Sequence, residues 1–260
     1  MMFQTIRLEF LGSIARLTLN RPEIRNAFDD LMISELLQAL ADLSLRKDVR
    51  GLVITGEGSA FSAGANIEWM KRMGEADFEA NHRDALQLAA MFDTLAELPF
   101  VTIAKVNGPA MGGGVGLVAV CDIAITAPEA FFSFTEVKIG LSPAVISPYV
   151  IRKIGAANAR ELFITGRRFD ALEAKRIGLV NFVSESGKLD EETDKLLKQI
   201  LTSSPNAVKA SKRLVQTIPL MDKGEYIDYT SRLIAELRTS SEGREGTRAF
   251  LEKRKADWAD

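Results

Sequence analysis

The segment Val101-Thr-Ile-Ala-Lys-Val-Asn-Gly-Pro-Ala-Met-Gly-Gly-Gly114 joins a short apolar run to a cluster of glycines. Residues 101–106 predict a buried strand, and the apolar residues 113–120 predict a helix. The first N–H groups of a helix are unpaired and favour negative charge, and small residues let a ligand oxygen approach the backbone. The segment is therefore a candidate site for an anionic oxygen, although for this loop alone glycines that only permit a tight turn are the simpler explanation.

A second loop of this kind, Ala60-Phe-Ser-Ala-Gly-Ala-Asn66, follows the apolar run 51–55. Its Ala-Phe-Ser start is echoed at 130–133, and each copy predicts a buried strand, a polar turn and a very short second strand. Strands recurring with helices between them favour stacked ββα turns over a simple doubly wound sheet, unless the likeness is chance. One N–H donor from each loop, converging on one point, would make an oxyanion hole.

The rest of the chain predicts further strands and many helices. A hairpin is expected over residues 5–20, with its turn at 11–13, and a short strand at 179–183. Helices are expected at 29–45, 76–98, 144–153, 156–164, 171–176, 190–202, 205–217, 222–238 and 242–255.

Composition excludes several kinds of chemistry in this chain of 260 residues. One cysteine and one histidine permit neither an intrachain disulfide nor a Cys/His zinc cluster, and we expect no metal. His82 sits in a polar segment and is interpreted as a surface residue, and Cys121 as a small buried hydrophobe. The formal net charge of −2 argues against nucleic acid as the main partner.

The chain shows no segment that predicts membrane insertion or export. Its N-terminus lacks an apolar stretch behind a basic region, and the apolar run 113–125 is short and interrupted by Asp122. We therefore expect a cytoplasmic protein. Two nucleotide and nucleophile motifs also fail, because Leu117 breaks a G-x-G-x-x-G pattern and the segment 140–144 lacks the last glycine of a nucleophile elbow.

Motifs along most of the chain resemble the crotonase superfamily of enoyl-CoA hydratases and isomerases. The resemblance runs in order from about residue 5 to the C-terminus. The motifs that carry it are Asn20-Arg-Pro-Glu-Ile-Arg-Asn-Ala-Phe28, Phe61-Ser-Ala-Gly-Ala-Asn66, Val106-Asn-Gly-Pro-Ala-Met-Gly-Gly-Gly114, Cys121-Asp-Ile-Ala124, Phe163-Ile-Thr-Gly-Arg167, Ala174-Lys-Arg-Ile-Gly-Leu-Val180 and Glu252-Lys-Arg-Lys255.

The resemblance implies an α/β fold, a crotonase-like spiral of ββα turns with a helical C-terminal trimerisation region. We place the spiral core at 1–200 and the helical oligomerisation region at 201–260. It implies a homotrimer, or a hexamer made of two trimers. It implies an acyl-CoA thioester substrate and no separate cofactor, because CoA is part of the substrate.

The resemblance also assigns roles to single residues. The backbone N–H groups of Ala65 and Gly113 are the implied oxyanion-hole donors, and Glu136 is the implied general acid/base. Two preorganised N–H donors stabilise the negative charge that an enolate places on the thioester oxygen. The residues expected to contact CoA are Arg25 and Ala27, the Ala63 carbonyl at the adenine ring, Asn66 and Ile67 of the same motif, and Lys253 at the phosphates.

One expected carboxylate is missing. Family hydratases commonly use two glutamates, but the first of the two positions is Gly116 here. Glu136 could activate water alone, or a substrate carboxylate or a water network could help. Glu129 and Glu68 lie nearby in sequence and are interpreted as structural.

A narrower resemblance points to the methylglutaconyl-CoA hydratase branch. It rests on Ile67-Glu-Trp-Met-Lys-Arg-Met73, Gly112-Gly-Gly-Val-Gly-Leu-Val118 and Leu141-Ser-Pro-Ala-Val-Ile-Ser-Pro-Tyr149. It favours 3-methylglutaconyl-CoA as the substrate of a hydratase. Candidate partners for the substrate's carboxylate are Lys71, Arg72, Ser142 and Tyr149.

Two other functions stay open. A Δ3–Δ2 enoyl-CoA isomerase needs only one carboxylate to shuttle a proton. A relative that binds acyl-CoA or RNA without catalysis would also tolerate Gly116.

Overall fold

The computed structural model describes residues 3–259, and the chain divides into two compact units. The first unit comprises the chain up to Leu98 together with Thr102–Thr193. The second comprises Pro99–Val101 and the chain from Asp194 onward. The division falls inside helix α7 (Leu189–Leu201), a few residues before the boundary at 200 that the sequence suggested.

A mixed six-stranded sheet forms the centre of the first unit, with the order β1-β2-β3-β4-β6-β9. The predicted hairpin is confirmed as β1 (Ile6–Leu11) and β2 (Ile14–Leu19), which pair antiparallel. The pairs β2–β3, β4–β6 and β6–β9 are parallel. The remaining strands are β3 (Gly51–Gly56), β4 (Val101–Val106), β6 (Ile123–Thr126) and β9 (Phe182–Val183).

The strand predicted at 179–183 is shorter than expected. Only β9 pairs in the sheet, beside the carboxyl end of β6. Leu179 and Val180 precede it and are buried, but their N–H groups both donate to the Ala174 carbonyl (2.9 and 3.3 Å). Their backbone therefore closes the end of helix α6 (Ala171–Arg176) instead of joining the sheet.

A second, three-stranded sheet follows the first, with the order β5 (Ala110–Met111), β7 (Phe131–Ser133) and β8 (Phe169–Asp170). The very short strand predicted after the polar turn at 130–133 is confirmed as β7. The matching strand predicted at 60–62 is wrong, because only an isolated bridge joins Ser62 to Ala110. The N–H groups of Phe61 and Ser62 both donate to the Pro109 carbonyl, so no regular ladder can extend.

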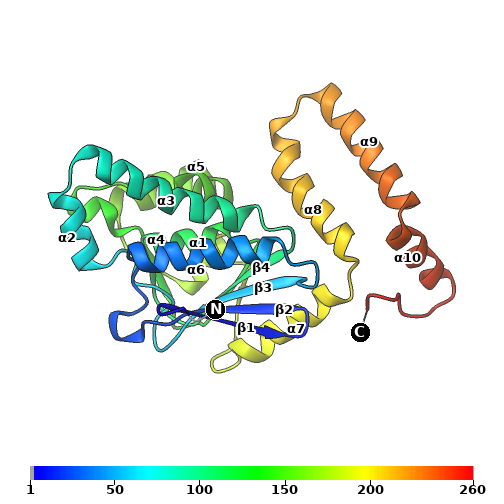
Figure 1. Cartoon of the computed structure of the whole chain (residues 1–260), viewed down its shortest axis with the longest axis horizontal. Helices are drawn as coiled ribbons and strands as arrows, with labels where there is room; N and C mark the ends of the chain where they lie inside the picture. Colours follow the sequence, from blue (N-terminus) through cyan, green and yellow to red (C-terminus); the bar gives the residue numbers. More distant parts are fainter. Residues whose placement is uncertain (1–2, 260) are drawn as a thin grey trace. The chain divides into compact units, whose positions relative to one another are not determined.

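Helices cover the sheet of the first unit, and α1 (Asp30–Ser44) packs along α3 (Phe78–Ala96) (Figure 1). A separate helix α2 (Ile67–Glu75) precedes α3. Asp77 is the N-terminal cap residue of α3, and its side chain accepts a hydrogen bond from Ala80 N–H. The apolar helix α4 (Gly113–Val120) is confirmed. The two helices expected at 144–153 and 156–164 merge into α5 (Ser147–Thr165), interrupted at Gly155 by a φ of +75°.

The second unit is helical, with α8 (Pro205–Thr217), α9 (Lys223–Thr239) and α10 (Ser241–Leu251) after the end of α7. Helix α10 ends four residues before the predicted residue 255. The Arg254 guanidinium turns back to the buried Glu245 carboxylate (2.6 Å), which requires the chain to leave the helix. Lys253 lies in this turn with a φ of +53°.

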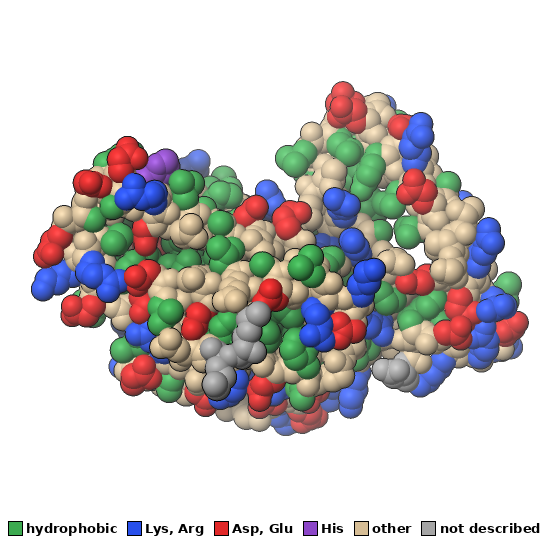
Figure 2. All heavy atoms as spheres, viewed as in Figure 1, with side chains coloured by type: hydrophobic (Ala, Val, Ile, Leu, Met, Phe, Trp, Pro, Cys, Tyr) green, Lys and Arg blue, Asp and Glu red, His purple; other side chains and the backbone are tan. Residues whose placement is uncertain are grey.

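Within residues 3–259, no helix is long and apolar enough to cross a membrane. Acidic and basic side chains are mixed over the face visible in Figure 2, with apolar side chains between them. Neither sign of charge dominates that face, in agreement with the net charge of −2.

The side chains of the buried Asn26 and the half-buried Asn107 hold the loops that follow β2, β3 and β4. The Asn26 side chain donates to the carbonyls of Glu57 (3.0 Å) and Ala60 (2.9 Å) and accepts from Arg21 N–H (2.9 Å). The Asn107 carboxamide accepts a hydrogen bond from Gly56 N–H (3.1 Å) and donates one to the Gly58 carbonyl (2.9 Å), which lies in the loop after β3. Buried backbone groups need such partners, so these side chains fix the loops in the first unit.

We expect Asn26→Ala to lower the free energy of unfolding by about 2–4 kcal/mol, because it strands buried backbone groups. Alanine also tolerates the φ of +56° at this position less well than asparagine. Urea unfolding measures the change. Asn158→Ala is the control, because the Asn158 amide donates to one carbonyl within its own helix. An equal loss in the two variants would contradict the clamping role of Asn26.

Candidate active site

The two glycine-bearing loops lie against each other, as the sequence suggested. Met111 N–H donates to the Ser62 carbonyl (2.9 Å), which ties the second loop to the first. Gly64 has a φ of +83°, and a Cβ at this position would lie 2.8 Å from the Met111 carbonyl oxygen. A Cβ on Gly114 would likewise lie 2.8 Å from the Ser62 carbonyl oxygen. Glycine at both positions therefore allows the two backbones to touch.

The Ala65 and Gly113 N–H groups are open donors within the part of the chain that the structure describes. In the bridge between Phe28 and Ala65, Phe28 N–H donates to the Gly64 carbonyl (2.6 Å) and its carbonyl accepts from Asn66. Ala65 N–H takes no part in this bridge. Gly113 opens helix α4, where the first N–H groups have no partner inside the helix. The contact between the loops brings these donors into one region of the first unit.

Glu136 belongs to the short 3-10 helix η2 (Thr135–Ile139) and faces the second loop. A Cβ built on Gly112 would lie 3.2 Å from Glu136 Oε1, so the carboxylate rests on the backbone beside Gly113. Its Oε2 is buried and finds no hydrogen-bond partner among the described residues. Burial raises the pKa of the Glu136 carboxyl, and a hydrogen bond with its own backbone opposes the shift. A carboxyl so placed can exchange protons with a bound ligand.

The predicted CoA-contacting residues of the first unit gather around the first loop. Ala63 N–H donates to the Arg25 carbonyl (2.8 Å). Arg25 is exposed and has a φ of +53°, whereas Ala27 is buried. The Asn66 carboxamide caps α2 by accepting from Glu68 and Trp69 N–H, and the Ile67 side chain is 75% exposed.

Lys253 belongs to the second unit, and its contact with CoA phosphates stays a prediction.

The residues interpreted as structural have structural surroundings. Glu129 is exposed and accepts a hydrogen bond from the Ser186 hydroxyl (2.8 Å), and Glu68 lies in the first turn of α2. His82 is exposed and stacks on Phe78, and Cys121 is buried. Over residues 3–259 no group of three His, Cys, Asp or Glu side chains is placed to hold a metal ion.

The candidate partners for a substrate carboxylate differ in their availability. Arg72 is held by Asp30 (2.7 Å) and is occupied by that ion pair. Lys71 and Ser142 are exposed, and Tyr149 is half-buried with its ring 6.0 Å from that of Phe92. Lys71 is thus the exposed cation of α2 that Asp30 does not hold.

The sequence motifs contain Asn26 and Ser62 but assign neither residue a role, although both position the first loop. The fully buried Ser62 hydroxyl donates to the Asn26 carbonyl (2.9 Å) and accepts from Gly64 N–H (3.2 Å). These contacts fix the turn that leads to Ala65. No local pattern separates a serine in this role from one in any polar turn.

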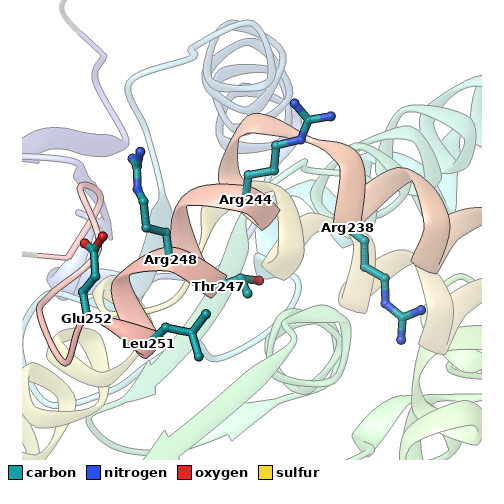
Figure 3. Close-up of a pocket in the computed structure, with 6 residues that line it drawn as sticks. All are labelled: Arg238, Arg244, Thr247, Arg248, Leu251 and Glu252. Atoms are coloured by element: carbon teal, nitrogen blue, oxygen red, sulfur yellow. The ribbon is translucent and has the colours of Figure 1, made fainter.

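A shallow pocket of about 390 Å³ lies on α9 and α10 of the second unit. Figure 3 shows that the guanidinium groups of Arg238, Arg244 and Arg248 point away from one another. They therefore do not converge on a single anion.

Comparison with known proteins gives the class of this fold and site. Residues 9–260 match the family model described as enoyl-CoA hydratase/isomerase. The chain therefore belongs to this family, and the crotonase-like spiral that the motifs implied is confirmed.

Solved structures from three organisms are similar over nearly the whole chain. An enoyl-CoA hydratase from Shewanella pealeana is 37% identical with a TM-score of 0.94, covering 98% of this chain and 96% of its own. Pseudomonas aeruginosa AtuE is 37% identical with a TM-score of 0.95, covering 99% and 100%. A Mycobacterium smegmatis enoyl-CoA hydratase is 29% identical with a TM-score of 0.93, covering 99% and 100%.

The raised pKa of Glu136 predicts a pH dependence of stability. The folded protein holds this proton more tightly than the unfolded chain does, whose carboxyl keeps a pKa near 4.5. Stability is therefore lost as pH rises from that value through the raised pKa. We expect Glu136→Gln to remove this loss, so that its melting temperature relative to the wild type is higher at pH 7 than at pH 4.

Thermal unfolding over this pH range measures the effect, with the exposed Glu129→Gln as the control. A difference between Glu136→Gln and wild type that does not change with pH would contradict the raised pKa of the Glu136 carboxyl.

Proposed function

We propose that the protein is an enoyl-CoA hydratase, which reversibly adds water to a 2-enoyl-CoA thioester. The observation that carries this proposal is the Glu136 carboxylate, which rests beside the open Gly113 N–H donor and whose Oε2 is buried with no hydrogen-bond partner among the described residues. Family membership supports a CoA thioester as the substrate class. Arg25, Ala27, Ala63, Asn66, Ile67 and Lys253 are proposed to contact the CoA part.

In the proposed reaction, the thioester oxygen accepts hydrogen bonds from Ala65 and Gly113 N–H. Glu136 takes a proton from water while the water oxygen bonds to the β-carbon, and the electron pair of the double bond moves toward the thioester oxygen. The resulting enolate is held by the two donors. Glu136 then returns its proton to the α-carbon, which completes the addition of one water and restores the carboxylate.

The favoured substrate is 3-methylglutaconyl-CoA, a step in leucine breakdown. Three motifs similar to that branch support it, and Lys71 is the cation proposed to meet the substrate's own carboxylate. We further propose a cytoplasmic homotrimer, single or paired as a hexamer, assembled through the helical C-terminal region. A panel of acyl-CoA esters followed by mass spectrometry tests the acyl chain, and preference for an uncharged linear enoyl chain would contradict this substrate.

Glu136→Gln tests the proposed reaction. We expect it to lower kcat for hydration by about 10²–10⁴-fold, because the amide cannot exchange the proton. The loss of enoyl absorbance measures the rate, and Glu129→Gln is the matched control. Wild-type activity in Glu136→Gln would overturn the assigned role.

A Δ3–Δ2 enoyl-CoA isomerase is the second candidate, favoured by the presence of one carboxylate at the two loops. It is separated from the hydratase by incubating a 2-enoyl-CoA and a 3-enoyl-CoA separately in heavy-oxygen water. A hydratase incorporates the label into the product of the 2-enoyl-CoA, whereas an isomerase converts the 3-enoyl-CoA into an unlabelled 2-enoyl-CoA. Tight acyl-CoA binding with no turnover across the panel would contradict both activities.

Gly64→Ala tests the oxyanion hole through the contact of the two loops. The new Cβ would press on the Met111 carbonyl and displace Ala65 from Gly113, so we expect kcat to fall by about 10²–10³-fold. Gly12→Ala is the control, because Gly12 also has a positive φ (+61°) but nothing within 4 Å of its Cβ position. Equal kcat values in the two variants would contradict the dependence of the oxyanion hole on this contact.

A further inference from the structure

Gly116 of α4 stands where the second glutamate is missing, and the space beside it is filled by side chains from other helices. A Cβ built on Gly116 would lie 2.3 Å from Cγ2 of Ile146 and 3.0 Å from Cζ of Phe92. Contacts shorter than 3.0 Å do not occur for real Cβ atoms, so even alanine cannot enter without a shift of its neighbours. Gly116 is therefore required by packing and is more than a lost carboxylate.

The two side chains that fill this position belong to different helices and are firmly held. Ile146 is the N-terminal cap residue of α5 and is 3% exposed, and Val150 N–H donates to its carbonyl (3.1 Å). Phe92 lies in α3, is fully buried and packs near Tyr149. The apolar surface at Gly116 is thus built where α3, α4 and α5 meet.

This apolar contact at Gly116 lies next to the second glycine-bearing loop. Gly116 N–H donates to the Gly112 carbonyl (3.2 Å), so Gly116 stands one helical turn after the residue on which the Glu136 carboxylate rests. One turn of an α-helix rises about 5.4 Å, so a side chain at 116 would approach the region of Glu136. Ile146 presents hydrocarbon at the place where a second carboxylate would otherwise stand.

We propose that Ile146, supported by Phe92, closes position 116 and thereby fixes this site as a one-carboxylate site. The inference rests on the proposed hydratase function for its catalytic part. The proton that water gives up then goes to Glu136 and returns from Glu136, with no second protein carboxylate taking part.

The steric part is tested by thermal unfolding without reference to activity. We expect Gly116→Ala and Gly116→Glu each to lower the melting temperature by about 5–15 °C, because overpacking a buried site is destabilising. Adding Ile146→Ala should restore much of that loss. Adding Ile154→Ala is the matched control, since Ile154 is a buried isoleucine two turns along the same helix.

The catalytic part is tested by the pH dependence of kcat/KM in the Gly116→Glu/Ile146→Ala variant. The pH profile of the wild type should show one ionisation, that of Glu136. The variant should gain a second ionisation from the new carboxylate and give a bell-shaped profile. A role of Ile146 in packing alone would leave the profile unchanged.

The outcomes separate this inference from the proposed function. Wild-type stability in Gly116→Glu, equal rescue by Ile154→Ala, or a single ionisation in a folded and active Gly116→Glu/Ile146→Ala variant would each overturn the role of Ile146. If that variant does not fold, the milder pair Gly116→Ala and Gly116→Ala/Ile146→Ala decides the steric role. A wild type that hydrates no enoyl-CoA overturns the proposed function, and the melting temperatures still judge Ile146.

Discussion

The direct contact of two backbones is the constraint on which the rest of the site depends. Gly64 leaves no room for a side chain above the Met111 carbonyl, and Gly114 leaves none above the Ser62 carbonyl. The loops follow the neighbouring strands β3 and β4 and lie at the same end of the sheet. The side chains of Asn26 and Asn107 form hydrogen bonds with backbone groups that these loops would otherwise leave unpaired. This contact holds Ala65 and Gly113 in one region, as their proposed joint role in an oxyanion hole requires.

The site obtains its polarity from the main chain, which explains a composition with one histidine and one cysteine. Helix α4 carries no charged side chain, and its N-terminal N–H groups supply the positive end of the helix dipole. Glu136 Oε2 is buried without a hydrogen-bond partner among the described residues, an arrangement that costs stability and is therefore typical of a functional position. Reactivity and stability oppose each other at this carboxylate.

Local patterns predicted the elements whose formation depends on local sequence. The β1–β2 hairpin, α1 and α4 follow from apolar periodicity and turn residues. The bridge at Ser62 and the early end of α10 depend on partners distant in sequence, the Pro109 carbonyl and the Glu245 carboxylate, which periodicity does not show. The residue pattern also indicated two glycine loops, whereas Glu136 was assigned a role only through the resemblance to the crotonase superfamily.

The absence of a second glutamate is a property of three helices and not of one residue. Because Ile146 of α5 and Phe92 of α3 occupy the space beside Gly116, restoring a carboxylate requires changes on more than one helix. A glutamate at 116 and an isoleucine at 146 can be accommodated together only if neighbouring atoms shift. Any path between a one-carboxylate and a two-carboxylate site on this fold must therefore pass through a change at 146 or a shift of α5, which makes the two positions a coupled pair.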